Sequence, residues 1–314
     1  MIISASYKTD IPTFYGEWFM NRLRAGYCKM VNPFNHKTVR VSLLRAEVDG
    51  FVFWTKNLGP FYKHLHEIKQ RGFPFIIQYT INAYPKALEF SVVDSSKSVD
   101  YFKRAAEEYG SRVCVWRYDP IVIASVSSKE YHLDSFERLA RQLRGSTDEV
   151  VISFAHLYKK TLKNMNWAAK EFAFSWHDPS LDEKRELAGE LAQISKANGI
   201  QLSICAQRDY LVQGAVDARC VDARRLEDTS GKRITAIQKG NRDECSCFAS
   251  RDIGEYDTCP HGCVYCYAVI NRELAQKRYR EHDPSSDFLF KPQQILEPDF
   301  QEDRQISLLP NPSL

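Results

Sequence analysis

The chain has 314 residues and a formal net charge of +3, and hydrophobic and charged residues make up 44% and 26% of it. This composition is ordinary for a globular protein with a sizeable core, in one large α/β domain or two smaller ones, and the charge is too small to indicate nucleic-acid binding by itself. No apolar run approaches the roughly 18 residues that a membrane-spanning helix needs, and the first residues lack the layout of a signal peptide. We therefore expect a cytoplasmic protein with no membrane partner.

Short apolar runs alternate with longer amphipathic segments along the first two thirds of the chain. The predicted strands cover residues 2–6, 51–55, 75–81, 113–118, 150–154 and 201–205. The predicted helices cover residues 12–25, 59–71, 97–109, 128–144, 158–172 and 181–198. Strands that are almost entirely apolar are typical of a parallel sheet covered by helices. Six strand-then-helix units predict an α/β fold in which residues 1–207 form a partial (β/α)6 TIM-like barrel.

The alternating pattern weakens beyond residue 207. Residues 208–282 are predicted to form an irregular, cysteine-rich iron–sulfur region that packs on the barrel rim, with helical character in 267–280. Residues 283–314 contain prolines, serines and acidic residues without periodicity, which predicts an extended or disordered tail.

Charged and hydroxyl side chains follow the carboxyl ends of the predicted strands, where reacting groups sit in barrels of this kind. We predict that five of them are catalytic and hold substrate and cofactor: Lys8, Asp10, Lys56, Arg117 and Asp119. Thr55 and Gln78 are predicted to bind a cofactor. The basic residues would face carboxylates or phosphates, and the aspartates would face hydroxyl or ammonium groups. Because loops are polar in any case, Asp10 and Asp119 also fit turn or helix-cap residues near their prolines.

Five of the nine cysteines lie between Cys245 and the end of the motif Cys259-x3-Cys263-x2-Cys266, in which Tyr265 precedes the last cysteine. In a reducing compartment such a cluster indicates metal binding rather than disulfides. Three thiolates at this spacing can hold a 4Fe-4S cluster and leave one iron open to an exogenous ligand. The main alternative is a structural zinc site, which typically uses paired C-x2-C elements and four ligands.

This motif resembles the signature of the radical S-adenosylmethionine superfamily. The resemblance implies a 4Fe-4S cluster chelated by S-adenosylmethionine, an external electron donor, a 5′-deoxyadenosyl radical that abstracts hydrogen from a substrate, and a Tyr265 that packs near the adenine. Most members place the motif after the first strand and carry Gly-Gly-Glu at the end of the second. Here the motif follows all six strands, and residues 54–57 stand where Gly-Gly-Glu is expected. A permuted arrangement, with the cysteine loop reaching the rim from the C-terminus, accommodates both differences.

The chain also resembles a family of uncharacterised bacterial proteins over nearly all of residues 1–282. The matching segments are residues 4–12 (SASYKTDIP), 53–57, 116–120 and 252–267. This resemblance implies a shared architecture and a shared C-terminal metal site, without an established substrate. The cysteine spacing and the Tyr-Cys-Tyr ending are also similar to the spore photoproduct lyase branch of radical enzymes, which repair DNA.

Four other cysteines are candidates for a second site, an iron–sulfur cluster or tetrahedral zinc: Cys205, Cys220, Cys245 and Cys247. Alternatively, Cys205 packs as a small hydrophobe and Cys220 is a bystander, and Cys28 and Cys114 are expected to be structural. His261 would either hydrogen-bond the cluster or cofactor, or pack the loop.

The favoured hypothesis is a radical S-adenosylmethionine enzyme whose substrate is a nucleic acid, a peptide or a small molecule. The alternative is a metal-stapled nucleic-acid-binding module without radical chemistry, and a weaker one is a redox protein that passes electrons between two clusters. Rim residues that would contact bases and phosphates in the binding module are Tyr79, Trp116, Arg117, Tyr158, Lys159 and Lys160. The chain has no P-loop, G-x-G-x-x-G segment or Ser-His-Asp ordering, so nucleotide-hydrolysing, nicotinamide and hydrolase functions have no support.

Overall fold

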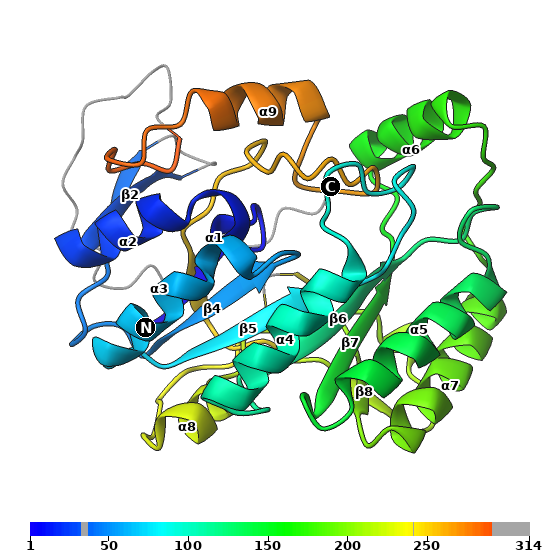
Figure 1. Cartoon of the computed structure of the whole chain (residues 1–314), viewed down its shortest axis with the longest axis horizontal. Coiled ribbons are helices and arrows are strands. Elements are labelled where there is room, and N and C mark those ends of the chain that lie inside the picture. Colours follow the sequence, from blue (N-terminus) through cyan, green and yellow to red (C-terminus); the bar gives the residue numbers. More distant parts are fainter. Residues whose placement is uncertain (33–36, 241, 291–314) are drawn as a thin grey trace.

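A parallel sheet of eight strands forms the centre of the computed structural model, which describes residues 1–32, 37–240 and 242–290 (Figure 1). In spatial order the strands are β10 (Ser250–Asp252), β1 (Ile2–Ala5), β4 (Gly50–Thr55), β5 (Phe75–Thr80), β6 (Cys114–Ile121), β7 (Glu149–Phe154), β8 (Gln201–Ile204) and β9 (Ala215–Asp217). Neighbouring strands pair in parallel throughout. The predicted α/β class is confirmed. Within the described ranges no pairing joins β9 to β10, so the sheet is open.

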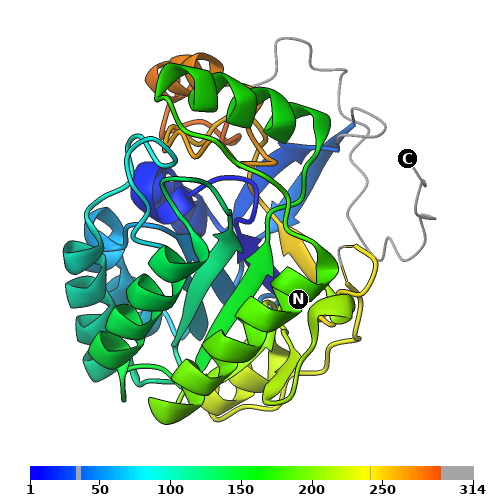
Figure 2. The same ribbon diagram turned by 90° about the vertical axis from the view of Figure 1, so that its right-hand side faces the viewer.

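All six predicted helical segments contain helices. The helices are α1 (Ile11–Phe14), α2 (Gly16–Ala25), α3 (Tyr62–Gln70), α4 (Ser95–Tyr109), α5 (Lys129–Leu143), α6 (Lys159–Glu171), α7 (Leu181–Ala197), α8 (Ala223–Ser230) and α9 (Arg272–Arg280), with short 3-10 turns at Gly59–Phe61 and Arg208–Tyr210. Helices α3, α4, α5 and α7 cover one face of the sheet, and α6 and α9 lie beyond one of its ends (Figures 1 and 2). An antiparallel hairpin of β2 (Tyr27–Val31) and β3 (Thr38–Ser42) stands outside the sheet and was not expected from the sequence.

Both faces of the central strands are buried, which explains why their sequences are almost continuously apolar. Side chains alternate between the faces along a strand. Phe51 and Phe53 of β4 therefore pack into the larger core under α3, α4, α5 and α7, whereas Val52 between them enters a second core. That second core contains Leu226 of α8, so the two cores lie on opposite faces of one sheet.

Strand β10 is the last strand in the sequence but lies beside the first. It pairs with β1 so that Ile2 is opposite Ser250 and Ser4 is opposite Asp252. At the opposite edge, β9 extends the sheet beyond β8. Residues 208–282 therefore supply both edge strands as well as α8, and this segment is built into the sheet rather than only resting on its rim.

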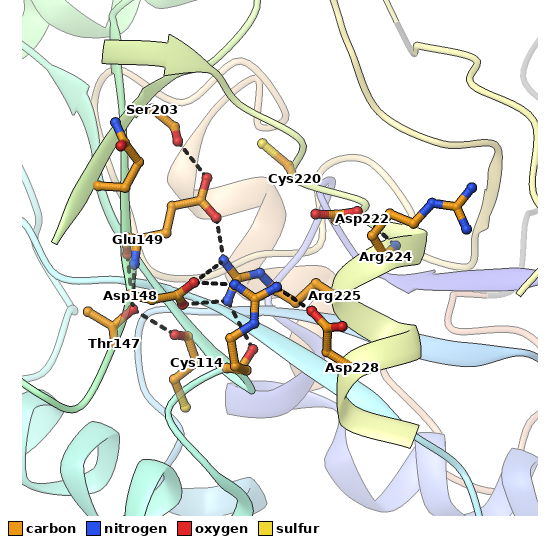
Figure 3. Close-up of polar contacts among 12 residues, drawn as sticks. Cys114, Thr147, Asp148, Glu149, Ser203, Cys220, Asp222, Arg224, Arg225 and Asp228 are labelled. Atoms are coloured by element: carbon orange, nitrogen blue, oxygen red, sulfur yellow. Dashed lines mark hydrogen bonds and ion pairs between the residues drawn. The ribbon is translucent and has the colours of Figure 1, made fainter. Parts of the chain in front are cut away.

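Helix α8 is fastened to the sheet by the buried guanidinium of Arg225 (Figure 3). Its Nη1 lies 2.7 Å from Asp148 Oδ1 and its Nη2 lies 2.6 Å from Glu149 Oε2, at the start of β7. Ser203 of β8 donates a 2.6 Å hydrogen bond to Glu149, and Arg112 pairs with Asp148. Because α8 begins soon after Cys220, this network also restrains the segment that carries that cysteine.

The first residues of the predicted tail are attached to the rest of the chain. Asp287 pairs with Arg22 at 2.5 Å and with Lys29 at 2.9 Å, and the Ser286 carbonyl accepts a hydrogen bond from Trp18. The remainder of the predicted tail, residues 291–314, lies outside the described residues. No helix in the described part of the chain is both long and apolar enough to cross a membrane.

Candidate functional site

A cavity of about 640 Å³ opens at the carboxyl ends of the strands, in the range of volumes that hold small ligands and cofactors. It is lined by seven of the predicted catalytic and cofactor-binding residues: Lys8, Asp10, Thr55, Lys56, Arg117, Asp119 and Tyr265. It is also lined by seven cysteines: Cys205, Cys220, Cys245, Cys247, Cys259, Cys263 and Cys266. The structure therefore brings nearly all the candidate residues to one place. Gln78 is not among the lining residues.

The loop that carries the motif cysteines follows β10 directly and forms one wall of the cavity. Gly262 turns the loop between Cys259 and Cys263 with a φ of 71°, and a Cβ there would come within 3.2 Å of Phe90 and Arg272 side-chain atoms. Burial raises the pKa of Cys259 to about 12, and it raises the pKa of Cys263 and of Cys266 as well. As thiols these groups stay protonated, and metal coordination would displace their protons.

None of the nine cysteines, all of which lie in the described ranges, forms a disulfide. Within the part of the chain that the structure describes, no group of three or more His, Cys, Asp or Glu side chains already stands in metal-binding geometry.

Asp10 connects the cysteine loop to two other segments of the wall. Its Oδ2 lies 2.7 Å from His261 Nε2 and accepts a 2.8 Å hydrogen bond from the Lys56 amide. Its Oδ1 accepts a hydrogen bond from the Thr13 amide and so caps α1. The helix-cap interpretation of Asp10 is therefore correct, and the same carboxylate lines the cavity. The buried Nδ1 of His261 has no hydrogen-bond partner among the residues that the structure describes.

Lys56 belongs to a buried cluster that includes a carboxylate missed at the level of sequence. Its ammonium lies 2.8 Å from Oε1 of Glu89, which also accepts hydrogen bonds from Tyr265 and, at 3.3 Å, from Asn82. Burial lowers the pKa of Lys56, but attraction to the Glu89 carboxylate outweighs it, so the pKa lies above its usual value. Burial also raises the pKa of Tyr265, which stays a neutral hydrogen-bond donor. Glu89 follows β5 in a segment without helical or strand periodicity, so no local signal marked it.

A second missed carboxylate, Asp252, holds the end of β10 against the end of β1. It accepts hydrogen bonds from the hydroxyls of Ser4 and Ser6 at 2.8 and 2.7 Å and from the Gly254 amide at 3.0 Å. The ammonium of Lys8 stands 3.7 Å from it. Gly254 fits because it has no side chain, since a Cβ there would lie 2.0 Å from Ser6 Oγ.

A family model described as a domain of unknown function (DUF1848) matches residues 2–268. The chain belongs to this family. The predicted membership in an uncharacterised family is thereby confirmed. The match covers both the N-terminal segment 4–12 and the three motif cysteines, which meet at the cavity. No curated protein and no solved structure matches the chain.

In the cavity of this DUF1848 chain, Arg117 forms a buried ion pair with Asp119, with a 2.5 Å separation. Burial would raise the pKa of Asp119, but the attraction of Arg117 lowers it below its usual value. Arg117 Nη1 also donates to Cys220 Sγ at 3.0 Å and to Gln78 Oε1 at 3.2 Å. Gln78 in turn donates a 2.8 Å hydrogen bond to the Cys220 carbonyl. Gln78, predicted to bind a cofactor, therefore supports the Cys220 segment from below the cavity.

Two aromatic residues that were predicted to stack on bases lie in the core. Tyr79 and Trp116 are fully buried, and the Trp116 indole donates to the carbonyl of Ile81. They are therefore unable to contact a nucleic acid in this fold. Tyr158 and Lys159 are exposed near the cavity, at the start of α6.

Proposed function

We propose that this DUF1848 protein is a radical S-adenosylmethionine-type iron–sulfur enzyme of the cytoplasm, supplied by an external electron donor and acting on a substrate yet to be identified. The observation that supports this best is the position of the C-x3-C-x2-C loop. It directly follows a parallel edge strand and faces a cavity that also contains buried lysines and carboxylates.

The residues of the loop fit a 4Fe-4S cluster with one open iron. Cys259, Cys263 and Cys266 would each bind one iron. The neighbouring His261 is held by Asp10 through its Nε2. The three thiolates of the motif are the natural donor set for such a cluster. When bound, the cluster and S-adenosylmethionine supply one-electron cleavage of a carbon–sulfur bond and hence a 5′-deoxyadenosyl radical.

The strand order supports a permuted version of the superfamily fold, and we propose that the open sheet is a partial TIM-like barrel. In space β10 is the first strand, and the cysteine loop follows it as the motif follows the first strand in most radical enzymes. The second strand in space is β1, which runs into the segment from Ser6 to Asp10. The counterpart of the Gly-Gly-Glu position would then be this segment, and not residues 54–57.

The side chains around the loop are suited to hold a cofactor and a substrate. Lys8 and Lys56 would place positive charge against carboxylates, and the carboxylate of Asp10 would face an ammonium group. Thr55 supplies a hydroxyl, and the neutral Tyr265 would pack near the adenine. Arg117 and Asp119, which also line the cavity, would orient the substrate. The buried surroundings keep water away from the reacting groups.

The proposal is tested by anaerobic purification and reconstitution. We expect a brown protein that binds about four irons at the motif and that, when reduced, converts S-adenosylmethionine to 5′-deoxyadenosine. Cys263→Ser should lose both properties while its circular dichroism spectrum stays that of a folded protein. Cys28→Ala, which removes a buried thiol distant in sequence from the loop, should retain both. A colourless wild-type protein that fails to cleave the cofactor after reconstitution would refute the proposal.

The metal-stapled nucleic-acid module remains the second candidate, supported by the exposed Tyr158 and Lys159 beside the cavity. Lys160 lies 5.4 Å from the Tyr256 ring and extends this basic, aromatic surface. Cys263→Ala separates the two functions. Loss of turnover in a folded protein favours the enzyme, whereas unfolding together with loss of metal favours the staple.

A further inference from the structure

Four cysteines from distant parts of the sequence meet on the wall of the cavity that is formed by β8 and the loop before β10. Cys205 directly follows β8, Cys220 follows β9, and Cys245 and Cys247 precede β10. The Sγ atoms of Cys205 and Cys220 are 3.5 Å apart. The Cys247 thiol also lies beside those of Cys220 and Cys245. The four thiols thus form one continuous group.

We propose that Cys205, Cys220, Cys245 and Cys247 bind one zinc ion in a closed tetrahedral site that is distinct from the C-x3-C-x2-C loop. The inference does not depend on the proposed radical chemistry, because it uses none of the three motif cysteines. Tetrahedral coordination by four thiolates, with every position taken by protein, is the arrangement of structural zinc.

The spacing of the thiols favours a single ion over a cluster. A zinc–sulfur bond of about 2.3 Å places the sulfurs of a tetrahedron about 3.8 Å apart. The 3.5 Å separation of Cys205 and Cys220 is close to that value. In a 4Fe-4S cluster each ligand sulfur binds a different iron, so the ligand sulfurs stand much farther apart. In a 2Fe-2S cluster two cysteines share each iron, and iron and sulfide analysis distinguishes that case. The same 3.5 Å is too long for a disulfide, whose bond is about 2.05 Å.

Two non-glycine residues beside these cysteines have positive φ angles, which are uncommon for residues with a side chain. Ala206 and Glu244, each next to one of the thiols, have φ angles of 49° and 59°, in the left-handed region that favours glycine. At Gly240 a Cβ would lie 2.3 Å from the carbonyl oxygen of Cys245. Only glycine therefore allows the backbone at position 240 to lie this close to Cys245. Non-glycine residues held in this region concentrate at functional sites. Here they flank Cys205 and Cys245, one of them beside each thiol.

Hydrogen-bond donors surround the thiol group and suit a negatively charged site. A zinc ion with four thiolates has a net charge of about −2. Arg117 Nη1 lies 3.0 Å from Cys220 Sγ, and Arg242 Nη2 lies 3.5 Å from Cys205 Sγ. The amide of Val221 donates to Cys247 Sγ at 3.4 Å. Such N–H donors to ligand sulfurs orient the ligands and stabilise their charge.

No three of the described donors yet stand in metal-binding geometry, so zinc binding would require the four thiols to turn toward one point. The ion would then join the end of β8 to the loop that leads into β10 and to the segment before α8. It would stabilise the part of the chain that supplies both edge strands.

The test is metal analysis of the full chain purified anaerobically without added metal, then of the same chain with cobalt exchanged for zinc. We expect about one zinc per chain and, with cobalt, the intense visible bands of tetrahedral thiolate coordination. Cys220→Ser and Cys247→Ser should lose the zinc. Cys263→Ser should keep it, as should Cys28→Ala, the matched control for loss of a buried thiol.

Because Cys220 and Cys247 are buried, their variants can fail by misfolding, so Cys245→Ser and the cobalt spectrum of the wild-type chain provide independent evidence. Cys245 is only partly buried, and its replacement should lower zinc occupancy in a folded protein. The proposal is overturned if the wild type binds no zinc or cobalt, if Cys245→Ser retains full zinc, or if these four cysteines carry additional iron and sulfide instead. Recovery of Cys205 and Cys220 as a disulfide from the anaerobic protein would also overturn it.

Discussion

The buried pair of Lys56 and Glu89 offers a quantitative test of how the cavity wall is held together. The pair is 2.8 Å long, and the Lys56 and Glu89 side chains are only 14% and 4% exposed. In the variant Glu89→Gln the ammonium keeps a neutral acceptor but loses the opposing charge. At an effective dielectric constant of about 20, two unit charges at this distance attract by about 6 kcal/mol. Relief from burying the carboxylate offsets part of this loss, so we expect destabilisation of about 3 kcal/mol.

The assay is equilibrium unfolding in urea at pH 7, followed by far-ultraviolet circular dichroism. The matched control is Glu17→Gln, which removes the carboxylate of the 2.6 Å ion pair with Lys63, where the side chains are 57% and 66% exposed. Water screens that pair, so its loss should cost less than about 1 kcal/mol. The double variant with Lys56→Met should be more stable than the sum of the single changes predicts, because no unpaired charge remains. If Glu89→Gln costs no more than Glu17→Gln, the charge pairing inferred for this wall is wrong.

Three further predictions test the fold around the site. Burial lowers the pKa of His132 to about 4. The unfolded chain takes up this proton near pH 6.5, so about 3 kcal/mol of stability is lost as the pH falls from 6.5 to 4. Urea titrations should show a weaker pH dependence for His132→Gln, and an unchanged one would contradict the assignment. Arg225→Met removes the buried guanidinium from Asp148 and Glu149 and should lower the unfolding free energy by about 3 kcal/mol, again measured by urea titration. A change below about 1 kcal/mol would show that solvent already screens the network. Gly254→Ala forces a Cβ to within 2.0 Å of Ser6 Oγ and should lower the melting temperature. Gly189→Ala, in open space within α7, is the control and should raise the unfolding free energy by about 0.5–1 kcal/mol. Equal effects of the two variants would mean that the loop after β10 adapts freely to the added methyl group.

The sequence was sufficient to locate the strands and helices whose formation depends mainly on their own residues. Six strands of the central sheet and the helices between them were located because their apolar side chains bury continuous faces. The grouping of Lys8, Asp10, Lys56 and Asp119 followed from parallel strands, whose carboxyl ends must share an edge. The three motif cysteines were recognisable because their spacing is local.

The local hairpin of β2 and β3 escaped detection. The other missed strands are elements whose stability comes from distant partners. Strands β9 and β10 have three residues each, which is too short for a periodic pattern, and they exist because β8 and β1 offer backbone hydrogen-bonding groups. Glu89 and Asp252 became site residues only when folding buried them beside donors far away in the chain.

The four thiols of the proposed zinc site show the same difference between what the sequence predicts and what tertiary contacts determine. Composition alone indicated that Cys205, Cys220, Cys245 and Cys247 were candidates, but not that they would meet. Their convergence depends on β10 returning to the first strand and on α8 being fixed by Arg225, and both are contacts between residues far apart in the sequence. Local propensity and periodicity contain no information about such contacts, which is why the packed sheet, and not the order of residues along the chain, determined the shape of the site.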